Sequence, residues 1–209
     1  RLSATLRQFD AYPQHIRGKV IRTGPSGVGT LLELDQHGRI HFTPAMEMLE
    51  VLIEERRPAV LIVDPLSELH NAEENANTAL RTVIARFREL AIKHNIAVVI
   101  LHHTRKGAAG SSGDPDIARG ASAIIGAVRV ALTLTGMTED DARTFGLPAD
   151  AKLRNHFVRL DDAKANYSPI GDARWFEKVT YQLYNGEMVP AAVPWIPPAA
   201  KVASAENLA

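Results

Sequence analysis

The sequence predicts an α/β protein with a mostly parallel sheet flanked by helices. Residues 59–63 (AVLIV) and 96–101 (IAVVIL) are apolar runs with the length of buried parallel strands. Between them, apolar residues recur at intervals of three and four, as in an amphipathic helix. A strand, a helix and a second strand in this order form a right-handed βαβ unit, so the two strands should be parallel neighbours.

The segment before this unit predicts a hairpin followed by a helix. A short helix is expected within residues 1–17, ending before Pro13. Strand-like stretches follow at residues 19–23, 31–35 and 39–42. Thr43 supplies an N-cap and Pro44 fits the first helical position, so a helix begins there and stops at Pro58.

The segment after the unit continues the α/β pattern. Residues 107–116 are rich in glycine and serine and predict a loop. Residues 119–127 predict a helix of small residues, and residues 128–134 predict a third buried strand. Thr138 and the acidic residues after it begin another helix.

The C-terminal part predicts strands and then a tail. Residues 152–189 alternate enough to form antiparallel hairpins, with Asn185-Gly186 as the clearest turn. Residues 190–209 are rich in proline and alanine and predict a tail or linker. The sequence therefore predicts one domain over residues 1–189, followed by the tail.

Composition excludes several classes of protein. The 209 residues contain 24 basic and 24 acidic side chains, so net charge does not favour nucleic-acid wrapping or membrane attraction. The absence of cysteine excludes disulfides and thiolate metal sites and fits the reducing cytoplasm. No apolar run approaches the roughly 20 residues that a membrane span requires. We therefore expect a cytoplasmic protein with no membrane partner.

Polar residues follow both strands of the βαβ unit. Asp64 ends the first strand, and His102 and His103 follow the second. Parallel sheets bind ligands at their carboxyl edge, so a carboxylate and an imidazole should meet where a magnesium–phosphate complex would lie. Asp64 has the alternative role of capping the next helix. The histidines have the alternative role of zinc ligands, although no Asp, Glu or Cys accompanies them at ligand spacing.

A glycine-rich segment approximates a phosphate loop. Residues 24–30 (GPSGVGT) follow a strand-like stretch, but the pattern requires lysine before the final Ser or Thr. In this chain Thr30 follows Gly29 directly, and a strand comes next instead of a helix. We interpret the segment as an ordinary connection.

Four further cations and one amide are candidate site residues. Arg119 stands where the loop meets a helix and suits a guanidinium reaching a neighbour's γ-phosphate, or it is a surface arginine. Lys164 and Asn166 form a polar cluster where a strand becomes a loop. Arg105 and Lys106 flank the glycine-rich loop and would contact DNA phosphates, although the loop is equally a plain connector.

In order, the segments IVDP, LHHTRKG, RGASAI and VRLDDAKANYSP, followed by WFEK, resemble RecA-type ATPases related to the plasmid replicative helicase RepA. The resemblance spans about residues 45–180. It implies a RecA-like fold and a hexameric motor that uses ATP and Mg²⁺ to move on single-stranded DNA in plasmid or phage replication.

The resemblance also implies roles for individual residues. Asp64 matches the aspartate that orders Mg²⁺ through water, and His103 matches the γ-phosphate sensor, with His102 beside it as the alternative. Arg119 matches an arginine proposed to act in trans. Lys164, with Asn166 next to it, matches a basic motif near a neighbouring subunit's nucleotide.

The family's phosphate loop and catalytic glutamate have no match in this chain. Because the first residue is Arg1 and the opening resembles the helix after the glutamate motif, we expect an N-terminally truncated fragment that is inactive alone. Residues 96–101 should then have an open strand edge. The alternative is a non-catalytic binding protein on the RecA scaffold. A histidine-dependent hydrolase is a weaker alternative, since no serine, cysteine or carboxylate motif joins the histidines.

Overall fold

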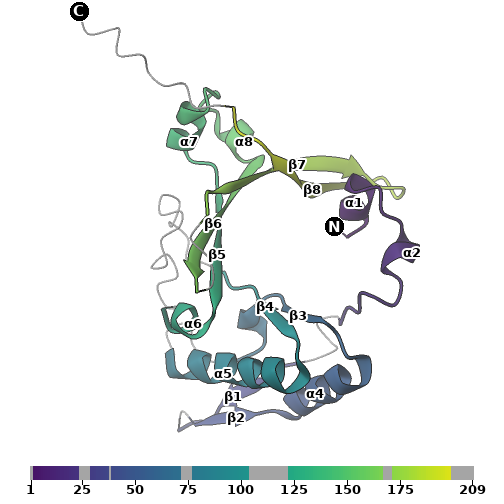
Figure 1. Ribbon diagram of the computed structural model, residues 1–209, viewed down its shortest axis with the longest axis vertical. Coiled ribbons are helices and arrows are strands. Elements are labelled where there is room, and N and C mark those ends of the chain that lie inside the picture. The colour runs from purple at the N-terminus through teal and green to yellow at the C-terminus, as the bar shows by residue number, and fades with distance from the viewer. Residues whose placement is uncertain are drawn as a thin grey trace, which may run out of the picture. The chain divides into compact units, whose positions relative to one another are not determined.

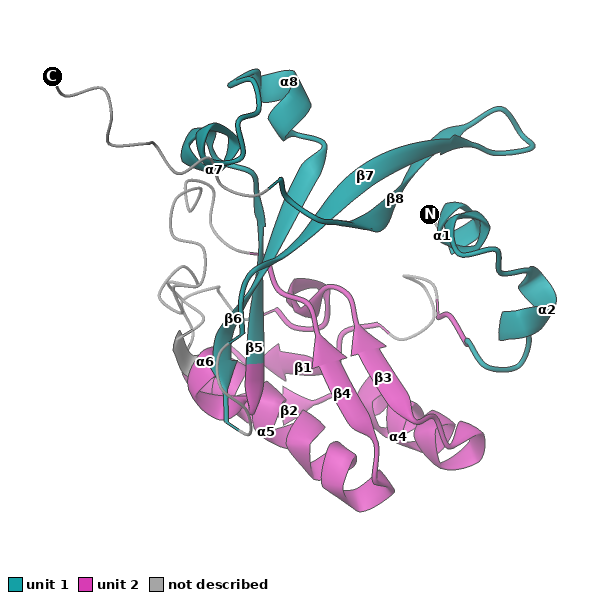
Figure 2. Cartoon of the chain, turned by 45° about the horizontal axis from the view of Figure 1, so that its top comes forward, with its two compact units in different colours: residues 1–20, 107–114, 131–209 teal, residues 21–106, 115–130 magenta. Residues whose placement is uncertain are grey.

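The computed structural model describes residues 2–23, 29–37, 39–71, 77–103, 122–166 and 171–198. The chain divides into two compact units, coloured separately in Figure 2. Unit 1 comprises Arg1–Val20, Gly107–Asp114 and Ala131–Ala209, and unit 2 comprises Ile21–Lys106 and Pro115–Val130. No helix in the described ranges is long and apolar enough to cross a membrane.

Unit 2 contains the predicted βαβ unit, preceded by a hairpin and a helix (Figure 1). Its elements are β1 (Leu32–Leu34), β2 (Ile40–Phe42), α4 (Pro44–Arg56), β3 (Val60–Val63), the 3-10 helix η1 (Leu66–Glu68), α5 (Asn77–His94), β4 (Ala97–Ile100) and α6 (Ser122–Ala127). Strands β1 and β2 pair antiparallel, as the sequence predicts. Strands β3 and β4 are parallel neighbours, with Val60 opposite Ala97 and Val63 opposite Ile100.

Helix α4 begins and ends at local signals in the sequence. Thr43 Oγ1 accepts a hydrogen bond from the Ala45 amide at 3.2 Å, and Pro44 is the first helical residue. At the other end, Arg57 adopts a left-handed φ of 44° before Pro58. The predicted boundaries are confirmed because caps and prolines act on the chain beside them.

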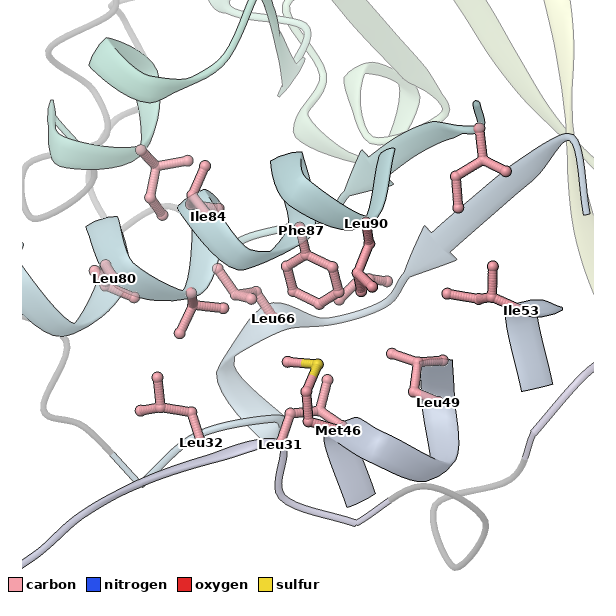
Figure 3. Close-up of a cluster of buried hydrophobic side chains, with 14 residues drawn as sticks. Leu31, Leu32, Met46, Leu49, Ile53, Leu66, Leu80, Ile84, Phe87 and Leu90 are labelled. Carbon is pink, nitrogen blue, oxygen red and sulfur yellow. The ribbon is translucent and has the colours of Figure 1, made fainter. Parts of the chain in front are cut away.

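A buried apolar core joins the hairpin, the two long helices and the β3–β4 pair (Figure 3). Helix α5 contributes the residues that its spacing predicts, and Phe87 and Leu90 are 1% and 0% exposed. Burial of each such side chain contributes about 1.5–3 kcal/mol. The other members of this core are Leu31, Leu32, Met46, Leu49, Ile53, Val63, Leu66, Leu80, Val83, Ile84, Ile96 and Ile124.

The β3–β4 pair is covered on one face only. Val63 is 5% exposed, whereas Val60, Ile62 and Val99 are 49%, 64% and 47% exposed. Successive side chains point to opposite faces of a strand, so the core covers one face and the described residues leave the other open. The expectation of strands buried on both faces is wrong for the described part of the chain.

Strand β4 has one strand neighbour among the described residues. Strands β3 and β4 form a two-stranded sheet, and within the described ranges β4 has no second strand partner. The expected open edge at residues 96–101 stays a prediction, because residues 24–28 and 104–121 lie outside the described ranges. Exposed edges of this kind are available for pairing with another strand.

Unit 1 contains a four-stranded sheet in the order β5-β6-β7-β8. Its elements are α1 (Leu2–Gln8), α2 (Pro13–Ile16), β5 (Val130–Gly136), α7 (Glu139–Thr144), α8 (Ala151–Arg154), β6 (Phe157–Ala165), β7 (Arg174–Gln182) and β8 (Met188–Trp195). Strand β7 pairs antiparallel with both β6 and β8, which confirms the predicted hairpins. Helix α1 lies against this sheet, where Arg7 Nη1 donates to the Gln182 carbonyl oxygen at 2.7 Å.

The start of α7 and a small aromatic core stabilise unit 1. Thr138 and Asp141 form a capping box, in which the Asp141 amide donates to Thr138 Oγ1 and the Thr138 amide donates to Asp141 Oδ2. This cap accounts for the predicted helix at Thr138. Phe145, Trp175 and Trp195 meet edge to face, with ring centroids 5.3–6.1 Å apart.

Two stretches differ from the sequence-based expectation. Residues 19–23 form no strand, since no described strand pairs with them. Residues 128–134 belong largely to β5, which joins the sheet of β6 and not that of β4, and Leu132 and Leu134 are 50% and 63% exposed. An apolar run indicates a strand, but its partner is set by distant residues.

Strand β8 extends past residue 190, where the sequence suggested the start of a tail. Pro190 lies opposite Thr180, and Pro194 lies opposite Phe176. Proline cannot donate to a strand ladder, but β8 is the last strand of its sheet among the described residues and has a free side there. The prolines therefore fit an edge strand.

Phe87→Ala should lower the free energy of unfolding by about 3–5 kcal/mol, because the ring is almost fully enclosed in the unit 2 core. Urea unfolding followed by circular dichroism measures this loss. Ile92→Ala on the same helix is the matched control, since Ile92 is 76% exposed, and it should change stability by less than about 0.5 kcal/mol. Equal losses in the two variants would contradict the core assignment.

Candidate functional site

The carboxyl ends of β3 and β4 lie together in unit 2. The Leu101 amide donates to the Val63 carbonyl oxygen at 2.8 Å, and the Leu66 amide donates to the Leu101 carbonyl oxygen at 2.9 Å. Asp64 directly follows Val63, and His102 directly follows Leu101. The structure therefore places Asp64 and the histidine pair at the same sheet edge, one strand apart, as the sequence predicts.

Asp64 is exposed and does not cap the next helix. The N-cap of η1 is Pro65, and that cap has no side-chain hydrogen bond. In the described part of the chain, the Asp64 carboxylate has no ion pair or side-chain hydrogen bond. The chain turns through a cis peptide between Asp64 and Pro65. The capping alternative is thus not supported, and the carboxylate faces solvent.

This carboxylate fits the chemistry of a magnesium site. Mg²⁺ prefers oxygen ligands and keeps several waters, so it is held by one or two carboxylates together with substrate phosphates. An exposed aspartate at a sheet edge, with no ion pair or side-chain hydrogen bond among the described residues, can serve as such a ligand.

The two histidines differ in their surroundings. The His102 side chain is partly buried, whereas His103 is exposed. No carboxylate or second ligand group joins either of them in a metal-binding cluster within the described residues. The zinc alternative for the histidine pair stays an untested prediction.

The segment after Asp64 is tied to the hairpin by contacts that sequence reasoning missed. The Leu31 and Leu32 amides both donate to the Leu69 carbonyl oxygen, at 2.8 and 3.2 Å. The Asn71 side chain accepts from the Leu34 amide at 2.8 Å and donates back to the Leu34 carbonyl oxygen at 3.4 Å. Asn71 is a positioning residue for this turn, and no periodicity or motif marks it in the sequence.

The remaining predicted residues belong to the other unit or fall outside the described ranges. Lys164 is on β6 and Asn166 follows that strand, so both belong to unit 1. Arg105, Lys106 and Arg119 fall in residues 104–121, outside the described part. Most of the glycine-rich segment, residues 24–28, is also outside it. The convergence of these side chains on Asp64 remains a prediction.

Comparison with known proteins identifies the family. The family model described as an AAA domain matches residues 1–109, which is more than half of the chain. The chain belongs to this AAA domain family. The matched segment of the AAA domain contains α4, the βαβ unit, Asp64 and both histidines.

The chain is also similar to a solved structure described as an ATPase domain. The sequences are 12% identical and the TM-score is 0.49. The match covers 71% of this chain and 51% of the other. This chain thus spans about half the length of that structure.

His102→Ala should destabilise the AAA domain by about 1 kcal/mol, because its partly buried side chain contributes packing. His103→Ala should change stability by less than about 0.5 kcal/mol, because its side chain is in solvent. Thermal and urea unfolding of the two variants measure the difference. A larger loss of stability in His103→Ala than in His102→Ala would contradict the assignment of His102 as the partly buried side chain.

Proposed function

We propose that this chain forms part of a RecA-type, ATP-hydrolysing motor of the RepA-like helicase group. The parallel pairing of β3 and β4, which brings Asp64 beside His102 and His103 at one sheet edge, is the observation that carries this proposal. Membership of the AAA domain family supports it. Asp64 orders Mg²⁺ through water, and a histidine of the pair senses the γ-phosphate.

The phosphate-holding lysine has to come from outside these residues. The sequence contains no G-x-x-x-x-G-K-[ST] motif. The described residues leave the outer edge of β4 without a strand partner, so a strand bearing such a loop has a place to pair. Paired there, it would bring the lysine to the edge that already holds Asp64 and His102.

We further propose that the chain assembles into a ring and acts on DNA. In a homo-hexameric ring, Arg119 and Lys164 act on the nucleotide of a neighbouring subunit. Arg105 and Lys106 contact phosphates of single-stranded DNA, whose movement is coupled to ATP hydrolysis. Plasmid or phage replication is the setting in which such a motor works.

A non-catalytic binding protein is the second candidate function. The missing lysine motif favours it, because a scaffold without that lysine holds ATP weakly. Such a protein would bind single-stranded DNA with the same affinity with or without ATP. The motor would bind DNA in a manner that depends on the nucleotide.

Asp64→Ala should reduce ATP hydrolysis at least about 100-fold in the protein that carries this chain together with a phosphate loop, since the metal supplies several kcal/mol of charge stabilisation. ATPase rates with and without single-stranded DNA test this. Asp140→Ala is the matched control, because its side chain is 86% exposed on α7. Undiminished hydrolysis in Asp64→Ala would remove Asp64 from the site.

A further inference from the structure

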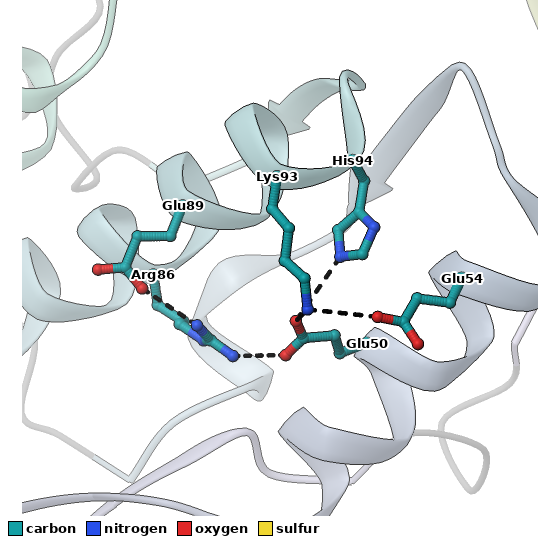
Figure 4. A network of polar contacts seen from close by, with 6 residues as sticks. All are labelled: Glu50, Glu54, Arg86, Glu89, Lys93 and His94. Atoms are coloured by element: carbon teal, nitrogen blue, oxygen red, sulfur yellow. Dashed lines mark hydrogen bonds and ion pairs between the residues drawn. The ribbon is translucent and has the colours of Figure 1, made fainter.

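A second polar cluster lies at the other end of the βαβ unit, where α4 and α5 end (Figure 4). Glu50 and Glu54 are one turn apart on α4, and His94 is the last residue of α5. One ligand atom from each of the three side chains lies within 4.8 Å of the others. It is the one group of this kind that the described ranges contain.

The cluster is partly withdrawn from water. The side chains of His94 and Glu50 are 11% and 17% exposed. His94 Nε2 is buried without a hydrogen bond, and the nearest acid, Glu50 Oε1, is 3.6 Å away. A buried imidazole nitrogen without a hydrogen bond loses the solvation it has in water, so a group that binds it is favourable.

Carboxylates and helix ends give the cluster negative charge, which Arg86 and Lys93 offset in the structure. Helices α4 and α5 both end beside the cluster, and the C-terminal end of a helix carries partial negative charge. Two carboxylates in the last turns of α4 add to that charge.

Lys93 occupies the cluster in the structure. Its Nζ lies 2.6 Å from Glu50 Oε1 and 3.3 Å from Glu54 Oε1. Arg86 holds the other Glu50 oxygen at 2.5 Å. The Lys93 side chain is 57% exposed, so it can turn into solvent at small cost, whereas Arg86 leaves Glu50 Oε1 available.

Space for a further ligand adjoins the cluster. A cavity of about 510 Å³ is lined by Glu54, Lys93 and His94, together with Arg57 and Asn95. Water in this cavity can complete the coordination of an ion held by the three side chains. Zinc-to-ligand distances of about 2.1 Å place tetrahedral ligand atoms about 3.4 Å apart. The ligand atoms of the cluster lie within 4.8 Å of one another, and the Glu54 side chain, which is 53% exposed, is free to move closer to the other two.

We propose that Glu50, Glu54 and His94 bind a divalent transition-metal ion, Zn²⁺ by the chemistry of the donors, in exchange for the Lys93 ammonium. One imidazole nitrogen, two carboxylate oxygens and one water make a four-coordinate zinc site. Mg²⁺ and Ca²⁺ prefer oxygen ligands alone, so the histidine selects against them. The bound ion joins α4 to α5, and Lys93 does so in its absence.

Zn²⁺ titration of the whole chain, by calorimetry and by competition with a chelator, tests this site. The wild type should bind one equivalent. Lys93→Ala should bind Zn²⁺ more tightly, because the competing ammonium is gone, and Zn²⁺ should raise its melting temperature more than that of the wild type. His94→Gln should weaken binding by at least about tenfold.

His41→Gln is the matched control, because His41 is an exposed histidine on β2 in the same unit. Its Zn²⁺ affinity should equal that of the wild type. Co²⁺ provides a second readout, since its visible spectrum distinguishes four-coordinate from six-coordinate sites. Three outcomes would each overturn the metal site: no stoichiometric Zn²⁺ binding, the same Zn²⁺ affinity in His94→Gln as in the wild type, or no increase in Zn²⁺ affinity in Lys93→Ala. The cluster would then be an ion-pair network only.

Discussion

The parallel pairing of β3 with β4 is the constraint on which the rest of unit 2 depends. Each strand is preceded by a long helix, so pairing the strands in parallel also brings the ends of α4 and α5 together. The carboxyl ends of the strands carry Asp64 and the histidine pair. The opposite end carries the cluster of Glu50 and His94. One pairing thus creates two polar regions with different chemistry.

Apolar burial and ion pairing contribute differently to holding α4 against α5. Enclosed side chains such as Phe87 each contribute about 1.5–3 kcal/mol. Exposed ion pairs such as Lys93–Glu54 contribute little to stability, because solvent screens them. The core therefore supplies the stability, and the charged network selects how the helix ends face each other. The proposed replacement of the Lys93 ammonium by a metal ion would leave this core intact.

Within the described residues, the β3–β4 pair has one uncovered face and one unpaired edge. Ile62 is 64% exposed on that face, and within the described residues the outer edge of β4 is unpaired. Exposed apolar surface is unfavourable in water, and an unpaired strand edge is available for pairing with another strand. The exposed face and edge are therefore the part of unit 2 to which a further strand could add.

The sequence by itself determined the features that depend on neighbouring residues. Caps at Thr43 and Thr138, the period of α5 and the βαβ order are local, and the family motifs around Asp64 are contiguous. Tertiary structure alone decided that residues 128–134 join the sheet of β6, that β3 is covered on one face, and that His94 meets Glu50. These outcomes depend on contacts between residues far apart in the chain, which local propensity and spacing do not encode.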